Sequence, residues 1–141
     1  MFFSLCLILI LSSSLPAYAF AGSQQKHSAE LGHMQRWINT AVVTVDLYIN
    51  SNGRAELSAI IIGNTGVESI TATAVLERIY ANGTTTHIRT WSNMRSEGNI
   101  WGWEGQQFVA RGHDYRFTVT ATVVRNGVSE TVSLSRTSHA H

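Results

Sequence analysis

The most regular part of the chain is the stretch Tyr115–Leu134, in which apolar and polar residues alternate. Apolar side chains occupy every second position of Tyr115–Val123, and Thr or Arg residues fill the positions between them. A period of two is typical of a β-strand with one buried face. Asn126-Gly127 follows, the dipeptide that best tolerates the positive φ angles of a tight hairpin turn. Because the alternation resumes after this turn, the stretch is predicted to form a β-hairpin.

Shorter alternating runs lie upstream, and most of them end at Gly- or Asn-rich turn signals. They cover residues 43–49, 55–61, 70–80, 84–91 and 106–109. A Gly-rich stretch, residues 92–105, interrupts the pattern and is expected to be an irregular loop. About seven short strands without a convincing helix predict an all-β fold, a single antiparallel two-sheet sandwich.

The N-terminus has the features of a signal peptide. Its apolar run, Phe2–Leu11, is shorter than the roughly 20 residues that span a bilayer. Ala17-Tyr18-Ala19 then provides the small-x-small pattern that signal peptidase accepts, and a cut after Ala21 is the alternative. We therefore expect residues 1–19 to be removed and the protein to be secreted. An uncleaved membrane anchor is the competing interpretation, because the segment before the apolar run lacks Lys and Arg.

Four segments follow from these patterns. Residues 1–19 are the predicted signal peptide, and the polar, aperiodic residues 20–36 form a flexible leader. Residues 37–136 form the predicted sandwich domain, and residues 137–141 form a C-terminal tail.

The composition of the exported chain excludes some kinds of chemistry and some classes of partner. The single cysteine, Cys6, lies in the signal peptide, so thiol catalysis and disulfides are excluded and core packing must hold the domain together. A secreted domain of this kind is more typical of bacteria than of animals. Ten Lys and Arg residues nearly balance nine Asp and Glu residues. Near-neutral charge without a basic cluster argues against nucleic acid, or a membrane after signal cleavage, as the partner.

One motif resembles a known structural corner. Residues 112–119, Gly-His-Asp-Tyr-Arg-Phe-Thr-Val, are similar to the E–F corner and F strand of fibronectin type III and immunoglobulin-like domains. In those domains a Tyr near the start of strand F bonds back to the backbone of the corner. The resemblance therefore implies that Tyr115 is a structural corner residue.

Residues 37–135 also resemble small secreted β-sandwich proteins of Gram-positive bacteria. The resemblance rests on three short motifs, Leu76-Glu77-Arg78, Thr90-Trp91 and Tyr115-Arg116-Phe117. That group has no established activity, so the resemblance implies an Ig-like or fibronectin-like fold and an extracellular location, and no function.

The most unusual local composition lies within the expected loop. Trp101 and Trp103 flank a Gly, with Asn99 and Glu104 nearby. Exposed indole rings beside polar side chains suit the recognition of carbohydrate or peptide, so these four residues are the predicted ligand-binding site. In the alternative interpretation, the spacing of two places both rings on one face of a strand and buries them in the core, where Trp37 and Trp91 could join them.

The histidines give no comparable signal for a metal. His139 and His141 form an H-x-H pair in the expected tail, and His27 and His33 lie in the leader. A stable zinc site needs three or four ligands held in place. We therefore predict neither a metal nor a cofactor.

Catalytic motifs are also missing. The sequence lacks G-x-S-x-G, H-E-x-x-H and P-loop motifs. Ser92, His113 and Asp114 could be assembled into a triad only by selecting them for that purpose. A carboxylate pair for glycoside hydrolysis could come from Glu97, Glu104 or Asp114, but most chains of this size offer such a set. We therefore expect a protein that is not an enzyme.

The sequence thus predicts a secreted, non-catalytic β-sandwich module that binds a polysaccharide or a cell-surface protein. One alternative is an extracellular structural subunit that self-associates through sheet edges. A second alternative is an unrecognised small hydrolase or a secreted effector.

Overall fold

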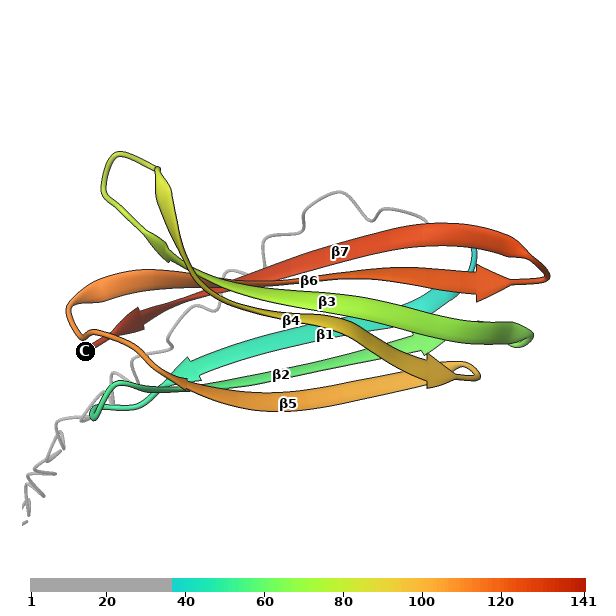
Figure 1. Cartoon of the computed structure of the whole chain (residues 1–141), viewed down its shortest axis with the longest axis horizontal. Helices are drawn as coiled ribbons and strands as arrows, with labels where there is room; N and C mark the ends of the chain where they lie inside the picture. The colour runs from blue at the N-terminus through green and yellow to red at the C-terminus, as the bar shows by residue number, and fades with distance from the viewer. Residues whose placement is uncertain (1–36) are drawn as a thin grey trace, which may run out of the picture. The chain divides into compact units, whose positions relative to one another are not determined.

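A computed structural model describes residues 37–141 of the protein, so the predicted signal peptide and leader lie outside the described residues. Antiparallel strands form two sheets that pack face to face (Figure 1). The strands are β1 (Thr40–Ile49), β2 (Arg54–Gly63), β3 (Val67–Ile79), β4 (Thr85–Glu97), β5 (Ile100–Phe108), β6 (His113–Arg125) and β7 (Val128–Ala140). The predicted all-β, two-sheet sandwich is confirmed.

The two sheets have different sizes. The smaller sheet has the order β1-β2-β5, and the larger has the order β4-β3-β6-β7. The chain changes sheet between β4 and β5, so β5 returns to pair with β2. This order places β4 beside β3, whereas a constant-type immunoglobulin domain places its fourth strand beside the fifth.

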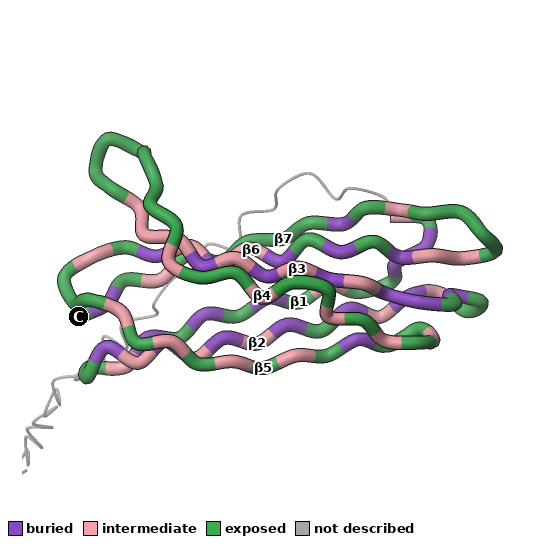
Figure 2. The backbone as a smooth tube through the Cα atoms, in the orientation of Figure 1, coloured by how far each residue is buried: buried purple, intermediate pink, exposed green. Residues whose placement is uncertain are grey.

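The core forms because alternate side chains of each central strand point between the sheets. Figure 2 shows this alternation along β2, β3 and β6 as a change between buried positions and positions that are intermediate or exposed. The inward positions of β6 run from Tyr115 to Val123 and face β2, whose inward side chains are Ala and large aliphatic residues. Each fully buried aliphatic side chain contributes about 1.5–3 kcal/mol relative to exposure.

The hairpin between β6 and β7 turns where the sequence predicts. Asn126 and Gly127 have φ angles of 50° and 72°, the positive values that a two-residue turn of this type requires. The predicted β-hairpin is therefore confirmed, and its strands extend beyond the predicted range at both ends.

The expected loop at residues 92–105 is wrong, because strands occupy nearly all of it. β4 continues to Glu97, and β5 begins at Ile100. Pairing with β2 runs unbroken along β5 and supplies the hydrogen bonds that Gly-rich segments do not secure alone. The indole of Trp103 also fills the space in which a Cβ on Gly105 would lie, which compensates for the missing side chain.

The expected C-terminal tail is also wrong. β7 continues to Ala140, which lies opposite His113 in the ladder with β6. The amide of Gly112 donates a hydrogen bond to the Ala140 carbonyl at 2.5 Å. β6 is as long as β7. It therefore offers backbone partners to the last residues of β7, which have no alternating pattern of their own.

A polar clamp secures the start of β1 against β7. The Glu130 carboxylate accepts hydrogen bonds from the backbone amide of Asn39 at 3.0 Å and from the Thr40 hydroxyl at 2.9 Å. The buried Asn39 amide group donates to the carbonyls of Val123 and Val128. Because each of these polar groups has a partner, the clamp avoids the cost of burying an unpaired one.

Tyr115 bonds back to the chain just before β6, which is the contact that the resemblance to a corner Tyr implies. Its hydroxyl donates to the Ala110 carbonyl at 2.8 Å, and burial raises the pKa of this hydroxyl. We expect Tyr115→Phe to lower the free energy of unfolding by about 1 kcal/mol, since it removes this hydrogen bond and leaves the carbonyl without its donor. Urea denaturation measures the change. Tyr80→Phe, at an exposed position, is the control, and an unchanged stability of Tyr115→Phe would contradict the assignment.

A cross-strand ion pair makes stability depend on pH. Arg116 donates a hydrogen bond to Glu77 at 2.9 Å, and this bond holds the pKa of the Glu77 carboxyl below its ordinary value of 4.5. A lowered folded-state pKa stabilises the fold above the unfolded value, and this stabilisation is lost as pH falls through the folded value. We expect Glu77→Gln to cost ~0.5 kcal/mol at neutral pH and nothing in strong acid. Urea denaturation at both pH values tests this. The control is Glu97→Gln, which removes the carboxylate of the exposed ion pair with Arg95.

Candidate functional site

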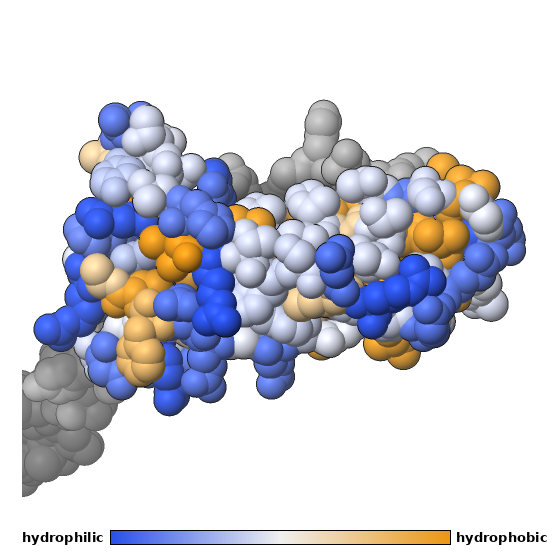
Figure 3. All heavy atoms as spheres, in the orientation of Figure 1, coloured by the Kyte–Doolittle hydropathy of each residue, from blue (hydrophilic) through white to orange (hydrophobic). Residues whose placement is uncertain are grey.

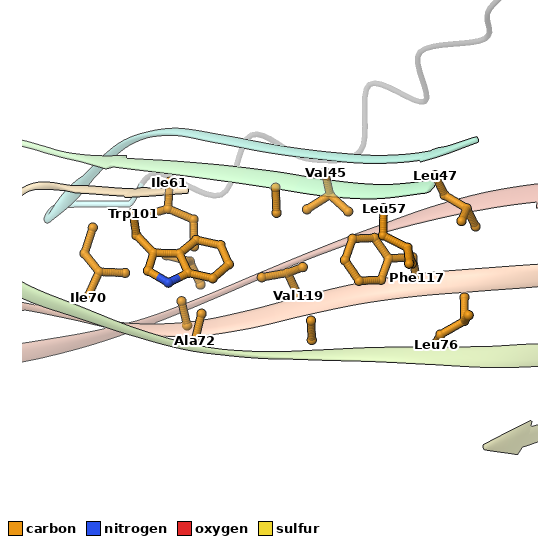
Figure 4. Packing of buried hydrophobic residues seen from close by; sticks show 14 of the residues in the cluster. Val45, Leu47, Leu57, Ile61, Ile70, Ala72, Leu76, Trp101, Phe117 and Val119 are labelled. Carbon is orange, nitrogen blue, oxygen red and sulfur yellow. The ribbon is translucent and has the colours of Figure 1, made fainter. Parts of the chain in front are cut away.

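The structure separates the four residues that were predicted to bind a ligand. Trp101 is only 3% exposed and lies between the sheets near Ile61, Ile70 and Ala72 (Figure 4). Such a ring cannot reach a ligand. The alternative interpretation, in which residues two apart on a strand are buried on one face, is therefore correct for Trp101.

The other three predicted residues point in different directions. Trp103 is half-buried beside Trp91, with ring centroids 5.0 Å apart, and Phe117, at 6.0 Å. Asn99 lies in the β4–β5 turn, where its side-chain amide donates to the Gly63 carbonyl at 3.4 Å. Glu104 lies on the outer face of the smaller sheet. The predicted set therefore does not form one site.

The two indoles should differ in their effect on stability. We expect Trp101→Ala to cost about 3–5 kcal/mol, the range for removing a large buried aromatic side chain. Trp103→Ala should cost clearly less, since part of its ring is already in water. Chemical denaturation compares the two variants, and equal losses would contradict the placement of Trp101.

His113 and Asp114, two residues of the candidate triad, each have another partner in the structure. The Nδ1 atom of His139 lies 2.7 Å from the Asp114 carboxylate, while the His113 ring contacts Arg78 at 3.0 Å. Asp114 is therefore paired with a histidine other than the one in the candidate triad. Within residues 37–141, the structure has no group of three His, Cys, Asp or Glu side chains placed to hold a metal.

The two outer faces of the sandwich differ in composition. The larger sheet presents mainly Thr and Ser, and some of these hydroxyls pair with each other across strands, as in Thr118–Ser135 at 2.8 Å. The smaller sheet presents large apolar and aromatic side chains at outward positions, namely Val42, Tyr48, Ile60, Ile100 and Phe108. An apolar surface exposed to water on one face of a sheet is typical of an interaction site.

Cross-strand register brings polar and aromatic groups together on that outer face. One row across the sheet is Asp46–Ser58–Glu104, and the next row is Tyr48–Glu56–Gln106. Together these six side chains line a shallow concavity of about 590 Å³. We call this feature the outer-face site.

The geometry of the outer-face site follows from strand spacing. Neighbouring strands lie about 4.8 Å apart, and side chains on one face of a strand repeat every ~6.7 Å. The Tyr48 ring is 63% exposed at the rim. Arg54 holds the Glu56 carboxylate through a 2.6 Å ion pair, which limits the directions in which that carboxylate can accept hydrogen bonds.

This arrangement can bind a molecule rich in hydroxyl groups. The face of a Tyr ring packs against apolar C–H surfaces, while carboxylates accept hydrogen bonds and the Gln106 amide both donates and accepts them. Asp46, Glu56 and Glu104 outnumber the neighbouring Arg54. The outer-face site is therefore negative and favours a neutral or cationic ligand.

Only Glu104 of this site was predicted. The alternation around Asp46 and Tyr48 already indicates outward positions, which is a signal that could have been used. The pairing of β5 with β2 brings Glu104 onto the same face as those residues, across β2 from them, and register between strands distant in sequence is not readable from alternation.

No family model matches the chain, and the comparison with curated proteins found no match. The solution structure of CsgH from R. palustris is similar to this chain with 13% sequence identity and a TM-score of 0.38, covering 66% of this chain and 91% of that chain. None of the residues that the structure describes forms a helix long and apolar enough to cross a membrane.

Proposed function

We propose that the protein is an exported, non-catalytic β-sandwich module that binds a polysaccharide at the outer-face site. The observation that carries this proposal is the exposed Tyr48 ring at the rim of a concavity lined by carboxylates and an amide. Glycan recognition needs this combination of a flat apolar surface and hydroxyl partners.

The shape of the site supports an extended ligand. Phe108 lies one row beyond Tyr48 on the same face of the sheet, opposite Arg54. Two exposed aromatic rings on one face offer successive contacts to a chain of sugar rings. Since the site is negative, a neutral polysaccharide or one with amino groups fits better than an acidic one.

Export and family remain part of the proposal. The apolar N-terminal run and the Ala-x-Ala pattern support secretion. The short motifs that resemble those of secreted Gram-positive β-sandwich proteins support a bacterial source and an extracellular location.

The exposure of the carboxylates supports a role in binding rather than in hydrolysis. A glycosidase needs one carboxylic acid kept protonated by an apolar environment. Asp46 and Glu104, which share one row of the sheet, are both exposed to solvent. Incubating the protein with bound polysaccharide should therefore release no new reducing ends, and release that Glu104→Gln abolishes would assign a hydrolase.

Binding can be tested by pull-down on insoluble polysaccharides and intact bacterial cell walls. We expect Tyr48→Ala to lower retention at least tenfold, because it removes the exposed ring that packs on the sugar. Tyr80→Ala, at an exposed aromatic position on the β3–β4 hairpin, should be retained like the unaltered protein. Equal retention of both variants, or no retention of any form, would overturn the proposal; circular dichroism confirms that each variant is folded.

A further inference from the structure

Edge strands of a sheet carry unpaired backbone groups that can pair with another chain, and most proteins protect them. The described domain has four edges, β1, β4, β5 and β7. β4 is interrupted by two register shifts and carries Arg89 and Arg95. β1 has a bulge between Thr40 and Val42 and packs against β7, and the clamp at Glu130 holds these two edges together.

β5 itself has neither a register shift nor a clamp within the part of the chain that the structure describes, and the one charged group that reaches it from β4 is Arg89, which donates a hydrogen bond to the Gln107 side chain at 3.2 Å. Its register with β2 is unbroken from Ile100 to Phe108, and its one charged side chain is Glu104. Figure 1 shows β5 at the border of the smaller sheet. On the side of the molecule seen in Figure 3, hydrophobic side chains gather toward the two ends of the view, with polar ones between them.

We infer that β5 pairs antiparallel with β5 of a second copy of this chain, about a two-fold axis at Gly105. The pairing would join the two three-stranded sheets into one continuous sheet. A second copy is the partner because the sequence of β5 is complementary to itself in this register.

The outward side chains show this complementarity. Gly102 has no atom within 4 Å of the position that a Cβ would take, and Phe108 is 68% exposed on the same face of the strand. A two-fold axis at Gly105 places each Phe108 opposite the Gly102 of the second copy. An aromatic ring beside a strand glycine covers backbone that the glycine leaves open.

The next pair on this face is polar. Each Glu104 lies opposite the Gln106 of the second copy, so the carboxylate can accept a hydrogen bond from the amide. On the inner face, the half-buried Trp103 lies opposite Gln107 and gains cover from the new strand. Cross-strand pairs of these kinds stabilise sheets.

Other registers fit less well. An axis at Glu104 would place the two carboxylates directly opposite each other, which is destabilising. An axis at Trp103 would place Glu104 opposite Gly102. It would also place Ile100, which is 61% exposed, opposite Gln106. Phe108 would then lie outside the paired region, so the register about Gly105 is the one that uses every outward side chain from Gly102 to Phe108.

This dimer goes beyond the proposed function and does not depend on it. A two-fold axis perpendicular to the sheet keeps both outer-face sites on the same side. One long polymer could then contact both sites, and linking two sites in this way raises apparent affinity by about 10²–10⁴ when the geometry allows it.

The first test is the mass of the full chain by light scattering and sedimentation over the micromolar to millimolar range. We expect a monomer–dimer equilibrium. Gln106→Glu should raise the dimer dissociation constant about tenfold, since two like-charge pairs form, and Gln106→Lys should lower it by a similar factor. Thr122→Glu, at an exposed position on the outer face of β6, is the matched control and should change nothing. A monomer throughout, or a dimer indifferent to both changes at Gln106, would overturn the inference.

The second test fixes the register by cross-linking in a Cys6→Ser background. A mixture of Glu104→Cys and Gln106→Cys chains should form a disulfide under mild oxidation, because directly opposed residues lie within disulfide reach. Either variant alone should cross-link poorly, since like residues are then diagonal across the pair. Equal cross-linking of the single variants would contradict the axis at Gly105, whatever the outcome of the polysaccharide pull-down.

Discussion

The burial of Trp101 between the two sheets is the interaction on which the outer face depends. Because this indole packs among aliphatic side chains of both sheets, β5 is held against β2 in one register. A slip by one residue would expose the indole and turn Glu104 inward. The same contact therefore stabilises the core and places the carboxylate and amide of β5 beside the side chains of β1 and β2.

The inner and outer faces of the sandwich differ in residue composition. Both inner faces are apolar, and the outer face of the larger sheet presents Thr and Ser hydroxyls, some of which pair with each other across strands. The outer face of the smaller sheet departs from this pattern with exposed aromatic and aliphatic groups beside carboxylates. Folding does not require that departure, and this is why we propose a binding role for this face.

The expected loop at residues 92–105 failed for a reason that can be stated. Gly102 and Gly105 lower the intrinsic preference for a strand, and the bulge with Asn93 at a φ of 56° breaks the alternation in β4. Pairing with β2 and β3 overrides both effects. The same long-range pairing with β6 orders the residues that were expected to form a C-terminal tail.

Local patterns along the chain were sufficient to predict the all-β class, the inward positions of most strands and the turn at Asn126-Gly127, because period two and positive φ are local properties. The position of β5 beside β2, the burial of Trp101 in the core and the placement of Glu104 on one face with Asp46 and Tyr48 became known from the folded structure alone. These outcomes depend on register between strands far apart in sequence. Alternation restricts register to steps of two residues, and side-chain packing selects among them.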